Sequence, residues 1–248
     1  MTQLSETTTF VAALAVIIIP FLVSSFTAIV SFQRKKRLKR TPLTSKLLRA
    51  PGETLRREIE ALEEKFDDNW LRWIALFVVP LLVLLTLVQL QNGKVHYWQI
   101  GLIGLLIVLC CVWFVRSIYR YLNKIIQLRL GLEAEIAVGQ ELNQLMRQGC
   151  HVYHDFPAEE FNIDHVVVGP GGIFAVETKG RSKPDRGRGT LDAKVIYDGE
   201  ALRFPDWHET QPLLQAKRQA VWLSKWLSSA TGEQIIARPV LALPGWFV

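Results

Sequence analysis

The chain has few cysteines and lacks the common signatures of several enzyme classes. Three cysteines occur in 248 residues, and Cys110 and Cys111 lie inside an apolar run, so we expect no disulfide framework. The sequence has no histidine pair at zinc-ligand spacing, no Gly-rich loop that opens a helix, and no supportable Ser-His-Asp arrangement. These absences argue against a disulfide-rich secreted scaffold, a zinc enzyme, a phosphate-loop protein and a serine hydrolase.

The N-terminal tail lacks positive charge. Its first nine residues contain Glu6 but no Lys or Arg, whereas a secretory signal peptide begins with a basic region. The apolar run that follows is also longer than the hydrophobic region of a typical signal. We therefore expect this run to remain in the mature protein.

Three long apolar runs occupy the first half of the chain, at residues 9–32, 73–90 and 98–115. About 20 apolar residues in a helix cross the roughly 30 Å hydrocarbon core of a bilayer. Trp and Tyr residues flank the second and third runs, as is typical of membrane interfaces. The pattern predicts three transmembrane helices in a lipid bilayer, with two buried helices of a soluble core as the alternative for the later runs.

Basic residues at the ends of these runs predict the orientation. Residues 34–40 contain six Lys or Arg, whereas the link at 91–96 contains only Lys94. Four more follow the third run: Arg116, Arg120, Lys124 and Arg129. Because basic segments stay in the cytoplasm, we expect a multi-pass inner (cytoplasmic) membrane protein with its N-terminus outside and its C-terminal domain in the cytoplasm. Residues 34–40 could instead bind nucleic acid, although anchoring explains them sufficiently, with contact to anionic lipid as a by-product.

The sequence divides into four segments. These are a tail with the first helix (1–32), a cytoplasmic basic loop with an amphipathic helix (33–72), a transmembrane hairpin (73–118) and a cytoplasmic domain (119–248). Within residues 53–70, apolar side chains recur every three or four positions, which is helical spacing. This helix is expected to pack on the cytoplasmic domain or lie along the membrane. The alternative is a short coiled coil that would make the protein a homo-oligomer.

The last segment has the pattern of an α/β domain. We expect a helix at 131–147 capped by Gly149, strands at 150–155, 162–168 and 173–179, a hairpin at 195–204, a helix at 208–229 and a strand at 239–243. The order is therefore α-β-β-β-(hairpin)-α-β. The sequence given stops shortly after the last strand, which leaves room for a capping segment beyond Val248.

The first hairpin brings two acids together. If Pro170 and Gly171 form the centre of its turn, Asp164 lies directly opposite Glu177. Opposed Cβ atoms are about 5 Å apart, and two such carboxylates repel unless they share a divalent cation. Lys179 follows Glu177 by two residues and so points to the same face. Carboxylates with Mg²⁺ or Mn²⁺ and an ammonium group suit phosphodiester hydrolysis.

A basic stretch follows this hairpin. Its cations can track the backbone of a nucleic acid, and they are Arg181, Lys183, Arg186 and Arg188. The alternative is that Glu177 and Lys179 form a solvated strand face and that the basic stretch is a solvated loop. Spacing alone leaves both readings open.

Four segments resemble the NERD (nuclease-related) domain. They are GLEAE at 131–135, NIDHVVV at 162–168, GIFAVETKG at 172–180 and QPLLQ at 211–215. The resemblance runs from about Gly131 to the end of the sequence. It implies the PD-(D/E)XK nuclease-like superfamily, with an αβββαβ restriction-endonuclease-like core.

The resemblance also implies roles for particular residues. Asp164 and Glu177 would bind the metal, Lys179 would be the motif lysine, and Glu135 and Gln215 would support metal or substrate. Ala134 stands where a glycine commonly precedes the helix glutamate, a small change that should leave the site intact.

Three functions remain open at this stage. The first is a membrane-anchored, metal-dependent nuclease that acts on nucleic acid, DNA in preference to RNA. The second is a non-catalytic module that tethers nucleic acid to the membrane, and the third is a scaffold for assembly. The set Asp164, Glu177 and Lys179 favours the first over the second, because a pure binder of a polyanion has no need of facing carboxylates.

Overall fold

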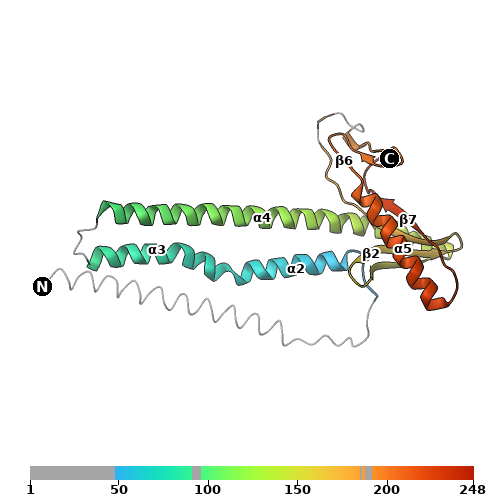
Figure 1. Ribbon diagram of the computed structural model, residues 1–248, viewed down its shortest axis with the longest axis horizontal. Coiled ribbons are helices and arrows are strands. Elements are labelled where there is room, and N and C mark those ends of the chain that lie inside the picture. The colour runs from blue at the N-terminus through green and yellow to red at the C-terminus, as the bar shows by residue number, and fades with distance from the viewer. Residues whose placement is uncertain (1–47, 91–95, 185, 188–191) are drawn as a thin grey trace. The chain divides into compact units, whose positions relative to one another are not determined.

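The computed structural model describes residues 48–90, 96–184, 186–187 and 192–248 (Figure 1). The expected first span, the basic residues 34–40, most of the 91–96 link and Arg188 lie outside the described residues. The chain divides into two compact units. One comprises Met1–Leu47 and Leu76–Val108, and the other comprises Leu48–Ala75 and Leu109–Val248.

The described part of the first unit is helical. It contains most of α3 (Trp70–Leu90), which includes Pro80, and the beginning of α4 (Tyr97–Gln144). Both later apolar runs are therefore helices, as predicted. Among the described residues, one helix, Tyr97–Gln148, has the length and apolar composition of a membrane span. Large apolar side chains on it, such as Leu102 and Leu109, are about 60% exposed, which is weak support for a membrane location.

Helix α4 is longer than the sequence pattern predicts. We expected a span ending near Val115 and a separate helix beginning at Gly131, but α4 runs unbroken through 48 residues. No Gly or Pro occurs between Gly104 and Gly131, so nothing in that stretch favours a helix end. A short 3₁₀ helix, Leu145–Gln148, follows, and Gly149 closes it with a φ of 82°, as expected for a C-cap.

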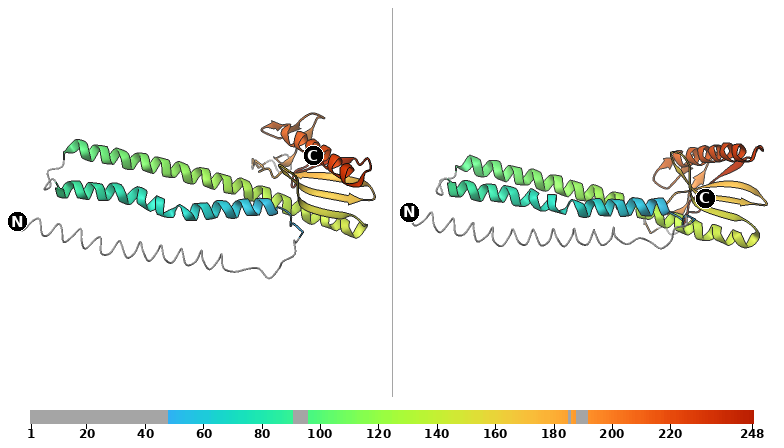
Figure 2. Two further views of the ribbon diagram at one scale, coloured as in Figure 1. Left: turned by 60° about the horizontal axis from the view of Figure 1, so that its bottom comes forward. Right: turned by 90° about the horizontal axis from the view of Figure 1, so that it is seen from below.

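A four-stranded sheet forms the centre of the second unit. Its strands are β1 (His151–Pro157), β2 (Asn162–Gly169), β3 (Gly172–Thr178) and β7 (Ala237–Ala242). Their order in the sheet is β1-β2-β3-β7, with β3 and β7 parallel. Helix α5 (Gln211–Thr231) covers one face, and the C-terminal end of α4 covers the other (Figure 2). All four strands were predicted from the sequence within about two residues.

A smaller sheet stands beside the main one. It contains β4 (Ile196–Tyr197), β5 (Leu202–Arg203) and β6 (His208–Glu209) in that order. The predicted hairpin is confirmed, and the Asp198 carboxylate closes its loop by accepting the backbone N–H groups of Glu200 and Ala201. The following helix begins at Gln211 and not at 208, because His208 and Glu209 pair with β5.

Helix α2 (Glu53–Asp68) packs against α4 within the second unit (Figure 1). The rings of Phe66 and Tyr121 stack with centroids 4.3 Å apart. Two ion pairs connect the helices, Lys124 to Glu58 at 2.8 Å and Arg129 to Glu63 at 3.2 Å. The apolar side of α2 thus packs against another helix of the same chain, in line with the expectation that this helix packs on the cytoplasmic domain.

Candidate active site

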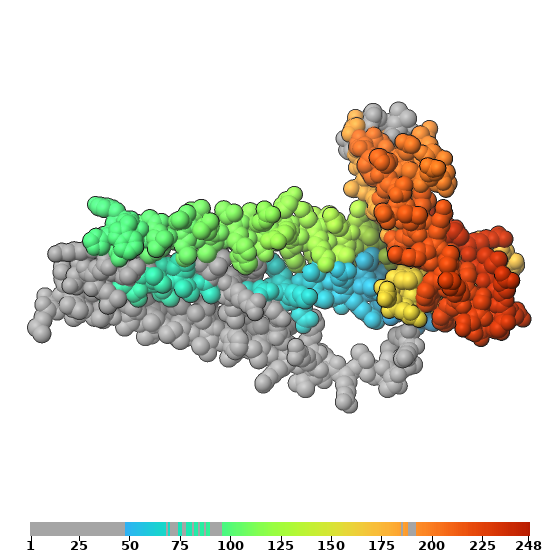
Figure 3. Space-filling view, in the orientation of Figure 1, coloured from blue at the N-terminus to red at the C-terminus, as the bar shows by residue number. Residues whose placement is uncertain are grey.

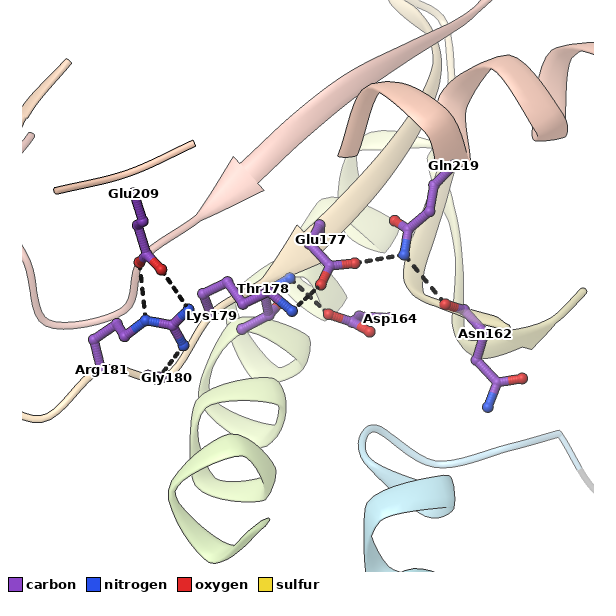
Figure 4. Close-up of polar contacts among 9 residues, drawn as sticks. All are labelled: Asn162, Asp164, Glu177, Thr178, Lys179, Gly180, Arg181, Glu209 and Gln219. Atoms are coloured by element: carbon purple, nitrogen blue, oxygen red, sulfur yellow. Dashed lines mark hydrogen bonds and ion pairs between the residues drawn. The ribbon is translucent and has the colours of Figure 1, made fainter. Parts of the chain in front are cut away.

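The β2–β3 hairpin has the register that the sequence predicts. Cα partners run from Gly169 and Gly172 at the turn to His165 and Val176, so Asp164 and Glu177 come next. The backbone pairing of β2 with β3 ends at this point, where the side chain of Asp164 bonds to the backbone of β3 instead. Its Oδ2 accepts the N–H of Thr178 at 2.6 Å. The carboxyl groups of Asp164 and Glu177 consequently lie next to each other (Figure 4).

Glu177 is buried, with 1% of its surface exposed, and both of its carboxylate oxygens have partners. Oε1 forms an ion pair with Nζ of Lys179 at 2.5 Å. Oε2 accepts a hydrogen bond of 2.5 Å from Nε2 of Gln219, a residue of α5 (Figure 4). The same amide nitrogen also donates to the carbonyl oxygen of Asn162 at 3.2 Å. A charged group can remain in the core here because it is paired and hydrogen-bonded.

Two further acids complete what we call the acidic cluster: Glu135, Asp155, Asp164 and Glu177. Glu135 comes from α4 and Asp155 from β1, and both are buried. Burial raises the pKa of Glu135 to about 7, with added repulsion from Asp155 and Glu177. Burial raises the pKa of Asp164 to about 8, with added repulsion from Glu177 and Glu135. Repulsion from neighbouring acids therefore contributes to the raised pKa values of Glu135 and Asp164.

The donor set of the acidic cluster suits a hard divalent cation. Its ligands are carboxylate oxygens, which Mg²⁺ and Mn²⁺ prefer to nitrogen or sulfur. Within the described part of the chain, no three His, Cys, Asp or Glu side chains form a ready-made metal site. That arrangement is compatible with Mg²⁺, which commonly takes one or two protein carboxylates and fills its remaining positions with water or phosphate.

The structure brings most of the predicted site residues together. Glu135, Asp164, Glu177 and Lys179 meet in one region, whereas the side chain of Gln215 makes no hydrogen bond to any described residue. Gln219, one helical turn after Gln215, contacts Glu177 instead. Sequence reasoning missed Gln219 and Asp155. A four-residue step along α5 would have pointed to Gln219, but no sequence pattern marks Asp155.

The basic stretch after β3 is less available for nucleic-acid binding than the sequence suggests. Arg181 forms a two-pronged ion pair with Glu209, with both N–O distances 2.9 Å. Arg186 pairs with Asp206 at 2.5 Å. Lys183 is exposed. Two of the predicted nucleic-acid contacts are thus already neutralised by acids that lie 20 and 28 residues further along the chain.

His154 of β1 and His165 of β2 form a pair next to the acidic cluster. His165, which follows Asp164, is completely buried, as expected for a side chain on the opposite face. Its Nδ1 is 2.9 Å from Nδ1 of His154, and Nε2 of His154 is 3.0 Å from Oδ1 of Asn143. Burial and the neighbouring His154 lower the pKa of His165 to about 4, so this ring is neutral at physiological pH. Nε2 of His165 has no hydrogen-bond partner among the described residues.

Comparison with known proteins gives one match. The family model described as the nuclease-related domain, NERD, matches residues 130–244. No curated protein and no solved structure matches the chain. The matched region runs from the end of α4 through β7, and it contains all four acids of the cluster together with Lys179. Residues 130–244 therefore belong to the nuclease-related domain family, as their resemblance to it predicts.

Proposed function

We propose that this protein is a membrane-anchored nuclease that hydrolyses phosphodiester bonds of nucleic acid, DNA in preference to RNA, with the help of Mg²⁺ or Mn²⁺. The observation that carries the proposal is the acidic cluster next to Lys179 inside a nuclease-related domain. Nuclease-like domains of the PD-(D/E)XK type usually use divalent metals. On this proposal the domain has their αβββαβ restriction-endonuclease-like core.

The charge of the cluster supports a divalent cation. Four carboxyl groups stand against two ion-paired cations, Arg49 on Asp155 and Lys179 on Glu177. If all the acids are ionised, the excess is two negative charges, which is the charge that a divalent ion neutralises. Glu135, Asp164 and Glu177 would hold the ion, directly or through its bound water. When bound, it would stabilise the negative charge that develops on the phosphate during hydrolysis.

The remaining groups bind and orient the substrate. Lys179 carries three N–H donors on a flexible stem, and its ammonium group can hold a phosphate oxygen or an attacking water beside the cluster. Lys183, which is exposed, would contact the nucleic-acid backbone. Arg188 is proposed for the same contact, together with Arg181 and Arg186 to the extent that their ion pairs open. Gln215, predicted to support the substrate, stays a prediction.

Cleavage by the full chain in detergent tests the proposal. Single- and double-stranded DNA and RNA are incubated with Mg²⁺, with Mn²⁺ or with a chelator. We expect metal-dependent cleavage that falls at least about 100-fold in Asp164→Asn and in Glu135→Gln. Glu133→Gln is the matched control, because it makes the same change on an exposed residue of the same helix. Loss of the signal in Glu133→Gln, or cutting that persists in Asp164→Asn, would contradict the assignment.

A second candidate function is binding without cleavage. Its support is that both oxygens of Glu177 already have protein partners, so the acidic cluster can be stable without metal. This candidate predicts salt-dependent binding of nucleic acid by the full chain, equal in wild type and Asp164→Asn, with no cutting under any metal condition. Absence of both binding and cutting would leave a scaffolding role.

The membrane part of the proposal has three spans, with the N-terminus outside and the nuclease-related domain in the cytoplasm. The apolar helix Tyr97–Gln148 supports a membrane location. Single cysteines at Thr2, Lys94 and Ser182, introduced after Cys110, Cys111 and Cys150 are changed to Ser, test the orientation. A membrane-impermeant thiol reagent should label the first two in intact cells and the third only after permeabilisation. Labelling of position 182 in intact cells would refute this topology.

A further inference from the structure

Residues 49–54, which we call the entry segment of α2, contact the acidic cluster although they lie far outside the matched region of residues 130–244. In Figure 3 the blue start of α2 lies against the yellow residues near the β1–β2 turn. The entry segment and the nuclease-related domain belong to the same compact unit.

The first contact is with Asp155. Nη1 of Arg49 lies 3.0 Å from Oδ2 of Asp155 and 3.3 Å from its carbonyl oxygen. The hydroxyl of Thr54 donates to the same Oδ2 at 2.8 Å. Asp155 is 3% exposed, and its φ of 46° is unusual for a residue other than Gly. A buried carboxylate in a strained backbone position is thus neutralised from outside the domain.

The second contact continues through Thr54 to Glu177. Nδ2 of Asn162 donates to Oγ1 of Thr54 at 2.6 Å. The carbonyl oxygen of Asn162 accepts from Gln219, and Gln219 donates to Glu177 (Figure 4). Thr54 is therefore connected directly to Asp155, and to Glu177 through Asn162 and Gln219.

The third contact is with α4. The Glu135 carboxylate lies beside Gly52, whose backbone N–H opposes the rise in the pKa of that group. Pro51 lies so close to Gly139 that a Cβ there would be 2.6 Å from its ring. Gly52 has a φ of 70°, which favours glycine at this bend. The entry segment is thus seated on the same helix that supplies Glu135.

We propose that the entry segment is a positioning element of the candidate metal site. Arg49 and Thr54 hold Asp155, Gly52 orients Glu135, and the Asn162–Gln219 connection fixes Glu177. The inference rests on the proposed function, since it assigns these residues to the same metal site. Groups that orient metal ligands typically change metal affinity 10–100-fold when they are removed. Residues outside the nuclease-related domain would then also determine how tightly the metal binds.

The test measures Mn²⁺ binding to the full chain in detergent, by electron paramagnetic resonance of the free ion. Thr54→Val keeps the shape of the side chain and removes its hydroxyl, and it should raise the Mn²⁺ dissociation constant about tenfold or more. Thr54→Ser restores the hydroxyl and should return the constant to within about twofold of wild type. Arg57→Ala is the control, because Arg57 pairs with Glu53 on the exposed side of α2.

A second variant guards against misfolding of the first. Arg49→Gln removes the ion pair on Asp155 and should also weaken Mn²⁺ binding, with the melting temperature in chelator recorded for every variant. If the wild type binds Mn²⁺ and both variants bind it equally well, the entry segment has no positioning role and the proposed function stands. A wild type that binds no divalent ion overturns both. Weak binding in Thr54→Ser or Arg57→Ala would show general disruption and also refute the inference.

Discussion

Gln219 donates a hydrogen bond of 2.5 Å from Nε2 to Oε2 of Glu177, and each residue is only 1% exposed. A hydrogen bond to a carboxylate is stronger than one between neutral groups, and it also fixes the direction of the lone pairs. The contact joins α5 to β3 across the core. It leaves Oε1 of Glu177 directed to Lys179.

Replacing Gln219 should therefore cost stability. Gln219→Leu leaves a buried carboxylate oxygen without a donor, and we expect the free energy of unfolding to fall by about 2–3 kcal/mol. Denaturant unfolding of the full chain in detergent measures the loss. Gln215→Leu on the same helix is the matched control and should change stability by less than about 0.5 kcal/mol. An equal loss in the two variants would contradict the assigned role.

The stability of the metal-free protein should fall as pH rises. The folded pKa values of Glu135 and Asp164, about 7 and about 8, lie above those of the unfolded chain, so the folded state keeps protons that the unfolded state releases. This contribution to stability is fully present below about pH 4 and is lost as the pH rises to about 8. We expect a melting temperature at least about 4 °C lower at pH 8 than at pH 5 in chelator.

Two variants and the binding of Mn²⁺ test whether Glu135 and Asp164 cause this dependence of stability on pH. Glu135→Gln and Asp164→Asn should each flatten the pH dependence, because each removes one titrating carboxyl group. Mn²⁺ should flatten it as well, since a bound cation replaces the protons. A slope that survives in the double variant would place its origin elsewhere.

Arg181 and Lys183 should respond in opposite ways to substitution. Arg181→Ala breaks the two-pronged ion pair with Glu209, so it should lower the free energy of unfolding by about 1–3 kcal/mol and affect binding less. Lys183→Ala should leave stability unchanged, weaken nucleic-acid binding and reduce the salt slope by about one. Binding titrations at several salt concentrations, with unfolding curves, separate the two effects. The reverse pattern would show that the Arg181 pair opens on binding.

A methyl group at position 139 should loosen the entry segment of α2. Gly139→Ala places its Cβ within 2.9 Å of two atoms of the rigid Pro51 ring, so the segment must move. We expect trypsin to cut after Arg49 several-fold faster. Gly131→Ala is the matched control on the same helix, because its Cβ meets only the flexible end of Leu55 at 3.2 Å. Equal cutting rates in the two variants would refute the tight seating.

Short-range patterns predicted the elements that depend on them. The Gly-Pro-Gly-Gly turn between two β-branched runs determines the β2–β3 register, and Asp164 and Glu177 come directly after its last pair. The Asp198-Gly199 turn likewise determines the β4–β5 pairing. In both cases the turn and the strands are adjacent in sequence, so the pairing follows from local geometry.

Contacts between distant segments could not be predicted in this way. Arg49 and Asp155 are 106 residues apart, and nothing in either segment identifies the other. The partners of Arg181 and Arg186 come from β6 and from the loop before it, whose position depends on the whole fold. The unbroken course of α4 was missed for a different reason, because the change from apolar to charged residues resembles a boundary although the backbone propensity for helix continues.

The hydrogen bonds around His154 decide which tautomer each histidine adopts. Oδ1 of Asn143 can only accept, so Nε2 of His154 carries the hydrogen and its Nδ1 is the bare nitrogen. Nδ1 of His165 must then donate across the 2.9 Å contact, which leaves Nε2 of His165 as a buried lone pair. An amide on α4 thus selects the tautomer of a ring that is adjacent in sequence to Asp164.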